Sequence, residues 1–196
     1  MFVYSTFLSA VIAAIAAVLL FTSEAQHGTL AASLTARPAR WLVAASKTIA
    51  AAAFGLVLGV TGMATGYVGA RLGGLDVGDT STMTATVLWG LLFTSLASVL
   101  GLGVGMVVRH SAAAVSGLLV WWLVVENLLW AFLPAEVSRF LPFYAGGAVL
   151  GVEVDTATPE TIAVALSRTQ DALVFGGVAA LALVLGTVLL YRRDTN

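Results

Sequence analysis

The sequence has no cysteine, only two histidines, and few charged residues, which make up 10% of its 196 residues. Without cysteine, the chain forms no disulfide and no thiolate metal site. The histidines, His27 and His110, have no second histidine or carboxylate at ligand spacing, so we predict no metal site. No GxxxxGK[ST] phosphate loop is present, which indicates that the chain does not hydrolyse ATP alone. We therefore predict that it is not an enzyme, has no catalytic residue, binds no cofactor itself and has no nucleic-acid partner.

The sequence is rich in apolar residues. They make up 60% of the sequence, and the mean hydropathy is +1.01. Apolar runs longer than about 18 residues are typical of membrane spans, because a soluble helix keeps one polar face. Five runs qualify, at residues 2–22, 48–70, 85–108, 111–134 and 172–191. The composition thus predicts one all-α transmembrane domain over residues 1–196, a polytopic bundle of five helices.

The charged residues predict the orientation of these spans. If the spans alternate, six basic residues fall on one side and three on the other, where most of the acidic residues also lie. The first group is Arg37, Arg40, Lys47, Arg109, Arg192 and Arg193; the second is Arg71, Arg139 and Arg168. By the positive-inside rule, the C-terminus is cytoplasmic and the protein is a multi-pass protein of the plasma membrane. The bias toward Arg, Ala, Val and Gly is typical of a GC-rich bacterial genome. Met1 then lies outside, and we expect a preceding helix to be missing.

The cytoplasmic connection 23–47 carries helix signals. Ser23 and Gln26 have the spacing of a capping box, and Pro38 ends the helical pattern. His27, Leu30, Ala31 and Leu34 share one face between them. The segment is interpreted as a short amphipathic helix at the cytoplasmic surface. A basic helix resting on anionic headgroups is an equally good interpretation.

The external connection 135–171 is long for a simple loop. It contains an apolar stretch, 144–151, that is too short to span a bilayer. Together with Pro142, Phe143, Gly146 and Gly147, this stretch predicts a re-entrant or interfacial segment. Residues 158–160, Thr-Pro-Glu, predict the start of a short surface helix.

Glu126 is an ionisable residue deep within a predicted span, followed by Asn127. A carboxyl group there is costly in lipid, so it should face protein or water. One interpretation is a role in a translocation path or gate. The other is a protonated glutamate that, with Asn127, holds helices together. Glycines four residues apart, such as Gly55 with Gly59 and Gly101 with Gly105, favour close helix packing.

The connection 23–47 resembles the permease subunits of type-2 (ABC-2) ABC exporters. The resemblance rests on Glu24, Gly28 and Thr29 after a span, then Arg37-Pro38 and Arg40, then Lys47 at the start of the next span. The Glu126 span, which ends near Pro134 and is followed by 141–143, is similar to the penultimate helix and external re-entrant segment of that family. The family usually has six spans, and this sequence matches the last five.

The resemblance implies a coupling helix that docks on a separate ABC ATPase subunit, which would bind ATP and Mg²⁺. The coupling residues would be Glu24, His27, Gly28, Thr29, Leu30, Arg37, Pro38 and Arg40. A second permease chain, identical or related, would complete the transport path for an apolar or amphipathic substrate. Two alternatives remain open: a membrane scaffold or anchor that transports nothing, and an ion-coupled secondary carrier that uses Glu126.

Overall fold

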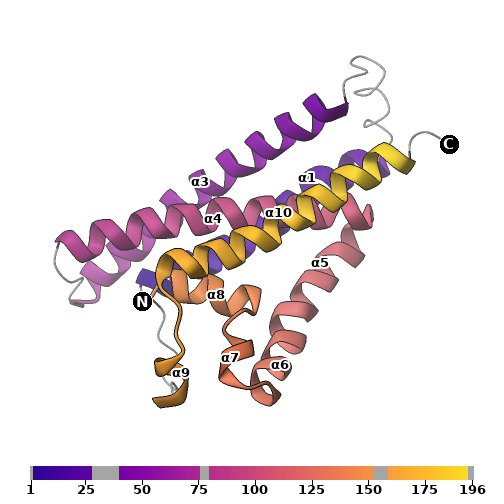
Figure 1. The fold of residues 1–196 in the computed structure, drawn as a ribbon. Coiled ribbons are helices and arrows are strands. Elements are labelled where there is room, and N and C mark those ends of the chain that lie inside the picture. The colour runs from indigo at the N-terminus through magenta and orange to yellow at the C-terminus, as the bar shows by residue number, and fades with distance from the viewer. Residues whose placement is uncertain (1, 28–39, 76–79, 152–158, 194–196) are drawn as a thin grey trace.

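The computed structural model describes residues 2–27, 40–75, 80–151 and 159–193, and the secondary structure within these ranges is helical throughout. The predicted all-α class is confirmed (Figure 1). In chain order the elements are α1 (Phe2–Gln26), α3 (Arg40–Leu72), α4 (Thr80–Val108), α5 (Ser111–Val120), the π-helix η1 (Trp121–Glu126), α6 (Asn127–Phe132), α7 (Ala135–Ser138), α8 (Pro142–Val149), α9 (Pro159–Ala163) and α10 (Arg168–Arg193).

Five helices in the described ranges are long and apolar enough to cross a membrane. They span Tyr4–Gln26, Trp41–Leu72, Met83–Val108, Ser111–Phe132 and Arg168–Arg192. The fourth runs without a break through α5, η1 and α6. The prediction of a multi-pass membrane protein with five membrane-length helices is therefore confirmed.

The first helix is longer than predicted. It continues past residue 22 to Gln26, so Ser23 and Gln26 lie in its last turn. The capping box predicted to open a new helix at Ser23 is wrong. Ser23, Glu24, Ala25 and Gln26 contain neither glycine nor proline, and the helix continues because nothing in them interrupts it. The Ser23 carbonyl accepts a helical hydrogen bond from the His27 N–H at 3.0 Å.

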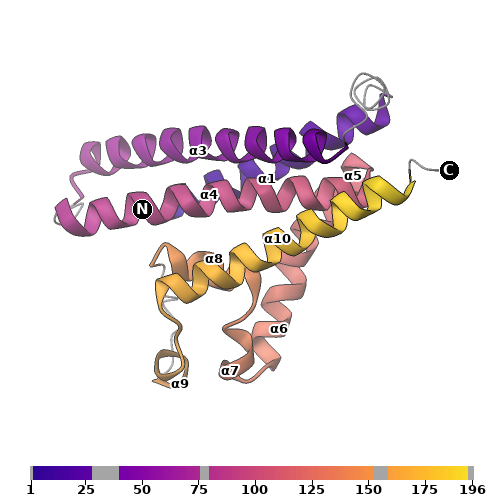
Figure 2. The same ribbon diagram turned by 45° about the horizontal axis from the view of Figure 1, so that its top comes forward.

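Helix α4 lies at the centre of a group of four long helices. Helices α1, α3 and α10 pack around it, with α3 antiparallel to the other three (Figures 1 and 2). We call the end of this group that holds Glu24, Lys47 and Val108 the Glu24 end. The opposite end, where α3 finishes and α4 and α10 begin, is called the Asp171 end.

Glycines on α4 allow its neighbours to approach closely. A Cβ atom added to Gly101 would overlap the backbone of Ala14 in α1, and one on Gly103 would lie 2.6 Å from the Ala182 carbonyl carbon in α10. On α3, a Cβ at Gly55 would lie 2.6 Å from the Thr94 carbonyl oxygen. The predicted role of these glycines in close helix packing is confirmed, since no larger side chain fits at these distances.

The segment after α4 leaves this group and then returns to it. Helices α5, η1 and α6 diverge from the four long helices, and α7 and α8 bring the chain back against α10 (Figures 1 and 2). The return is fixed by α8, whose Phe143, Ala145, Gly146 and Val149 are buried. Gly146 faces Phe93 of α4 and Phe175 of α10. The diverging helix and the returning segment form two walls of the site described below.

Candidate functional site

The fourth membrane-length helix widens into a π-helical turn over Trp121–Glu126. The Asn127 side-chain amide donates hydrogen bonds to the carbonyls of Trp122 at 3.1 Å and Leu123 at 3.3 Å. Asn127 thus supports its own helix at the wide turn rather than linking two helices. In a bilayer this matters, because no water is available to a backbone carbonyl there. Single π-helical turns within α-helices are frequent at functional sites.

Glu126 is the last residue of this π-helical turn and is 4% exposed. Its Oε1 accepts a hydrogen bond from the Tyr144 N–H at 2.6 Å. Tyr144 lies in the first turn of α8, after Pro142, where backbone N–H groups have no partner within the helix. The carboxylate therefore caps α8 from another helix, at the end where the helix dipole favours negative charge.

The second carboxylate oxygen of Glu126, Oε2, is in a different position. It is buried and has no hydrogen-bond partner among the described residues. A buried polar atom left in this way usually has a ligand, a water or a proton as its partner in the working protein. The sequence left two interpretations of Glu126. Its hydrogen bond with the Tyr144 N–H links two helices, as one of them predicts. The Oε2 atom, which accepts no hydrogen bond from the described residues, is compatible with the other, a functional role.

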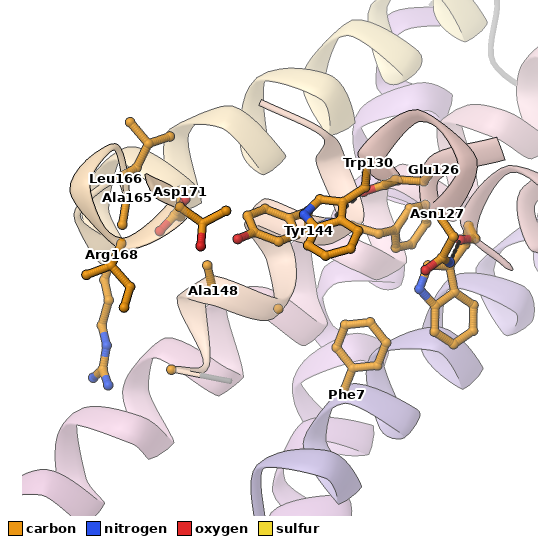
Figure 3. Close-up of a pocket in the computed structure, with 16 residues that line it drawn as sticks. Phe7, Glu126, Asn127, Trp130, Tyr144, Ala148, Ala165, Leu166, Arg168 and Asp171 are labelled. Atoms are coloured by element: carbon orange, nitrogen blue, oxygen red, sulfur yellow. Dashed lines mark hydrogen bonds between the residues drawn. The ribbon is translucent and has the colours of Figure 1, made fainter. Parts of the chain in front are cut away.

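Glu126 lines a pocket of about 710 Å³ (Figure 3). The pocket lies between η1 and α6 on one side and α8, α9 and the start of α10 on the other, and Phe7 of α1 also reaches it. Its volume is in the range, about 300–1,000 Å³, that holds small-molecule ligands. The lining residues are Phe7, Trp122, Glu126, Asn127, Trp130, Phe143, Tyr144, Gly147, Ala148, Gly151, Thr161, Ile162, Ala165, Leu166, Arg168 and Asp171.

Aromatic rings form much of the wall around Glu126. The Trp122 ring lies 5.3 Å from that of Phe7 and 5.9 Å from that of Phe143, between ring centroids. Trp130 stacks on Tyr144 with their centroids 6.5 Å apart. Such pairs hold large side chains in fixed orientations. The result is an aromatic wall around one carboxyl group.

Two further charged residues lie at the opposite end of the pocket, away from Glu126 (Figure 3). Asp171 of α10 is 4% exposed. The Arg168 guanidinium packs against Gly151, where a Cβ atom would lie 2.6 Å from its Nη2. Gly151 also has a positive φ of 73°, which favours glycine. Sequence reasoning did not select Asp171 or Arg168, because it placed both at the end of a loop.

The structure places the sequence-predicted re-entrant residues in two groups. Phe143 and Gly147 line the pocket with Glu126 and Asn127. Pro142 starts α8, and Gly146 packs against Phe93 and Phe175 outside the pocket lining. Nothing in the sequence between Glu126 and residues 142–147 predicts that these residues are in contact.

A second cluster of polar contacts lies at the Glu24 end. Lys47 Nζ is 2.5 Å from Glu24 Oε2, with the two side chains 11% and 33% exposed, and it also lies over the Phe21 ring at 5.9 Å. The Ser111 hydroxyl donates to Gln26 Oε1 at 3.0 Å. These contacts connect the end of α1 to the starts of α3 and α5.

The remaining predicted coupling residues are placed only in part. His27 follows α1, with its Nδ1 2.7 Å from the Ser23 carbonyl oxygen, and Arg40 begins α3. Gly28, Thr29, Leu30, Arg37 and Pro38 lie outside the described residues. His110, for which the sequence predicts no metal role, caps α5 by accepting a hydrogen bond from the Ala113 N–H at 3.3 Å.

Comparison of the chain with protein-family models, with curated proteins and with solved structures gave no match.

Proposed function

We propose that this chain is the membrane-spanning permease subunit of an ATP-driven exporter of the ABC-2 type, in a bacterial plasma membrane. It would move an apolar or amphipathic substrate, while a separate ABC ATPase subunit binds ATP and Mg²⁺ and hydrolyses the nucleotide. The observation that carries the proposal is the Glu24–Lys47 ion pair. It joins α1 and α3, the two helices that hold the first and last residues of the segment 23–47.

The ion pair supplies the mechanical connection that a permease of this kind needs. A permease alternates between two packings of its helices, and an outside force selects between them. Because Glu24 and Lys47 connect α1 to α3, and Gln26 connects α1 to α5, a displacement of the coupling segment would reach all three helices. The pair is partly buried, and removing one partner of a buried pair costs about 3–5 kcal/mol, less for a pair with this exposure.

The charge distribution supports the orientation that coupling requires. Arg40, Lys47, Arg109 and Arg193 belong to the Glu24 end, where the ATPase subunit would bind. The C-terminus would then be cytoplasmic. Helix α8 would be the external re-entrant segment, and a second permease chain, identical or related, would complete the path.

The experiment is co-purification from the native membrane. The tagged chain is solubilised in a mild detergent and the proteins that remain bound are identified by mass spectrometry. We expect a P-loop ATPase subunit to be retained by the wild type and by Arg71→Gln, a basic residue at the Asp171 end. Lys47→Gln should lose most of it. Absence of any ATPase from the wild-type complex, with the chain monodisperse, would contradict the proposal.

A second candidate is an ion-coupled carrier, and the buried Glu126 in its pocket is the observation that favours it. In that case transport would depend on an ion gradient and not on an ATPase subunit. Glu126→Gln would abolish that dependence, whereas Lys47→Gln would leave it. A membrane scaffold or anchor would show neither ATP-driven nor gradient-driven transport.

A further inference from the structure

The geometry points to a binding site for a lipophilic organic cation, whose positive charge lies against Glu126 in the pocket between η1, α6, α8 and α10. As a binding site it stands independently of the ATPase. As the substrate class of the transporter it rests on the proposed function.

The first step is the unsatisfied charge of Glu126. One carboxylate oxygen accepts the Tyr144 N–H and the other, buried oxygen has no hydrogen-bond partner among the described residues. Within the described ranges, no ion pair links Glu126 to a lysine or an arginine. The backbone N–H groups at the start of α8, together with the Trp121 side chain, support this carboxylate, and a ligand cation would complete its environment.

The second step is the chemistry of the surrounding wall. Rings of Trp122, Trp130 and Tyr144 line the same pocket as Glu126, and Trp130 and Tyr144 stack on each other. Aromatic faces attract cations within about 6 Å of the ring centre, most strongly for tryptophan. Aromatic rings together with one carboxylate recognise an organic ammonium or phosphonium ion, whereas a small metal ion needs several oxygen ligands.

The third step is the placement of the single arginine of the pocket. Arg168 lies at the end away from Glu126, beside Asp171 of the same helix turn, and its guanidinium packs against Gly151 (Figure 3). The Glu126 end is thus negative and the far end carries one charge of each sign. An anion placed among the Glu126 aromatic rings would be repelled by the carboxylate, so the site selects a cation.

The fourth step is the surroundings of the pocket. Three of the five membrane-length helices line it: the first through Phe7, the fourth through η1 and α6, and the fifth through the start of α10. Exposed apolar side chains such as Leu123, Val124 and Leu128 cover the outer face of η1 and α6. A ligand that enters past these side chains must itself be apolar apart from its charge.

The test uses two ions of nearly equal size and opposite charge. Tetraphenylphosphonium and tetraphenylborate are titrated against the full chain in lipid nanodiscs, with empty nanodiscs subtracted, and binding is followed by tryptophan fluorescence and equilibrium dialysis. We expect saturable binding of the phosphonium and only the background lipid partitioning of the borate. Glu126→Gln should weaken phosphonium binding by about tenfold or more, as expected for loss of a charge-assisted contact.

Two control variants distinguish binding in the pocket from non-specific binding to the protein. Glu136→Gln removes an exposed carboxylate of α7 outside the pocket and should leave the affinity unchanged. Trp130→Leu should weaken binding several-fold while Glu126 is intact. Equal binding of both ions, or a Glu126→Gln affinity equal to that of Glu136→Gln, would overturn the inference. Because no ATPase is present, failure here leaves the co-purification result standing, and the reverse also holds.

Discussion

Glu126 is the residue on which the site depends. It is a carboxyl group at membrane depth, and the structure supplies a physical reason for its presence there. A helix N-terminus from residues 142–149 meets it, and the Tyr144 N–H donates to it at 2.6 Å. One side chain thus holds the returning segment in place and carries the charge of the pocket.

Substitution of Glu126 should affect stability according to whether an acceptor remains. Glu126→Ala leaves the Tyr144 N–H without a partner and opens a cavity, so we expect a loss of about 1–3 kcal/mol. Glu126→Gln keeps a carbonyl oxygen for that N–H and should lose clearly less. Thermal unfolding in detergent, with Glu136→Ala as the control, measures the difference. Equal midpoints for the alanine and glutamine variants would contradict the capping role.

At the scale of elements, the wide turn of η1 depends on Asn127. Its amide donates to two carbonyls of that turn, which a continuous α-helix would have satisfied from its own backbone. Asn127→Leu should therefore destabilise the protein by about 1 kcal/mol or more. Thr65→Val is the matched control. The Thr65 hydroxyl also donates to two carbonyls of its own helix, but it is exposed and those carbonyls already accept backbone hydrogen bonds, so its loss should cost little. The same loss in both variants would contradict the account of the π-turn.

Glycine-to-alanine substitutions should change the stability in opposite directions at a closely packed position and at an open one. Gly101→Ala places a methyl group against the backbone of Ala14, so α1 and α4 must separate, at a cost of about 1–3 kcal/mol. Gly117→Ala on α5 meets nothing within 4 Å and should gain up to about 1 kcal/mol in helix propensity. Unfolding midpoints of the two variants test this. Similar shifts in both would show that the close approach of α1 is not essential.

At the scale of the whole molecule, much of the architecture could be predicted from the sequence and the site could not. The five long apolar runs are local signals, so the membrane-length helices were predicted, although α1 continues beyond the predicted boundary to Gln26. The meeting of Glu126 with Tyr144 depends on how the chain returns after α6, and no local pattern encodes that return. Likewise the sequence selected Glu24 and Lys47 singly, but their contact is a property of the packed helices.

The absence of cysteine from the chain allows the proposed orientation to be tested with single cysteines. His110→Cys, at an exposed position of the Glu24 end, should react with a membrane-impermeant maleimide only after the cells are opened. Leu75→Cys, beyond the end of α3, should react in intact cells. The reverse labelling pattern would contradict the positive-inside orientation.

The central claim is that the Glu24–Lys47 pair couples the bundle to a separate ATPase subunit, and exchange of the two charges tests it most directly. Glu24→Lys and Lys47→Glu are made singly and together, and retention of the P-loop ATPase subunit on the purified chain is measured for each. We predict that each single variant loses most of the ATPase and that the double variant recovers a large part of it, because substitutions at two contacting residues are energetically coupled. A double variant no better than the single ones, or single variants equal to the wild type, would contradict the claim.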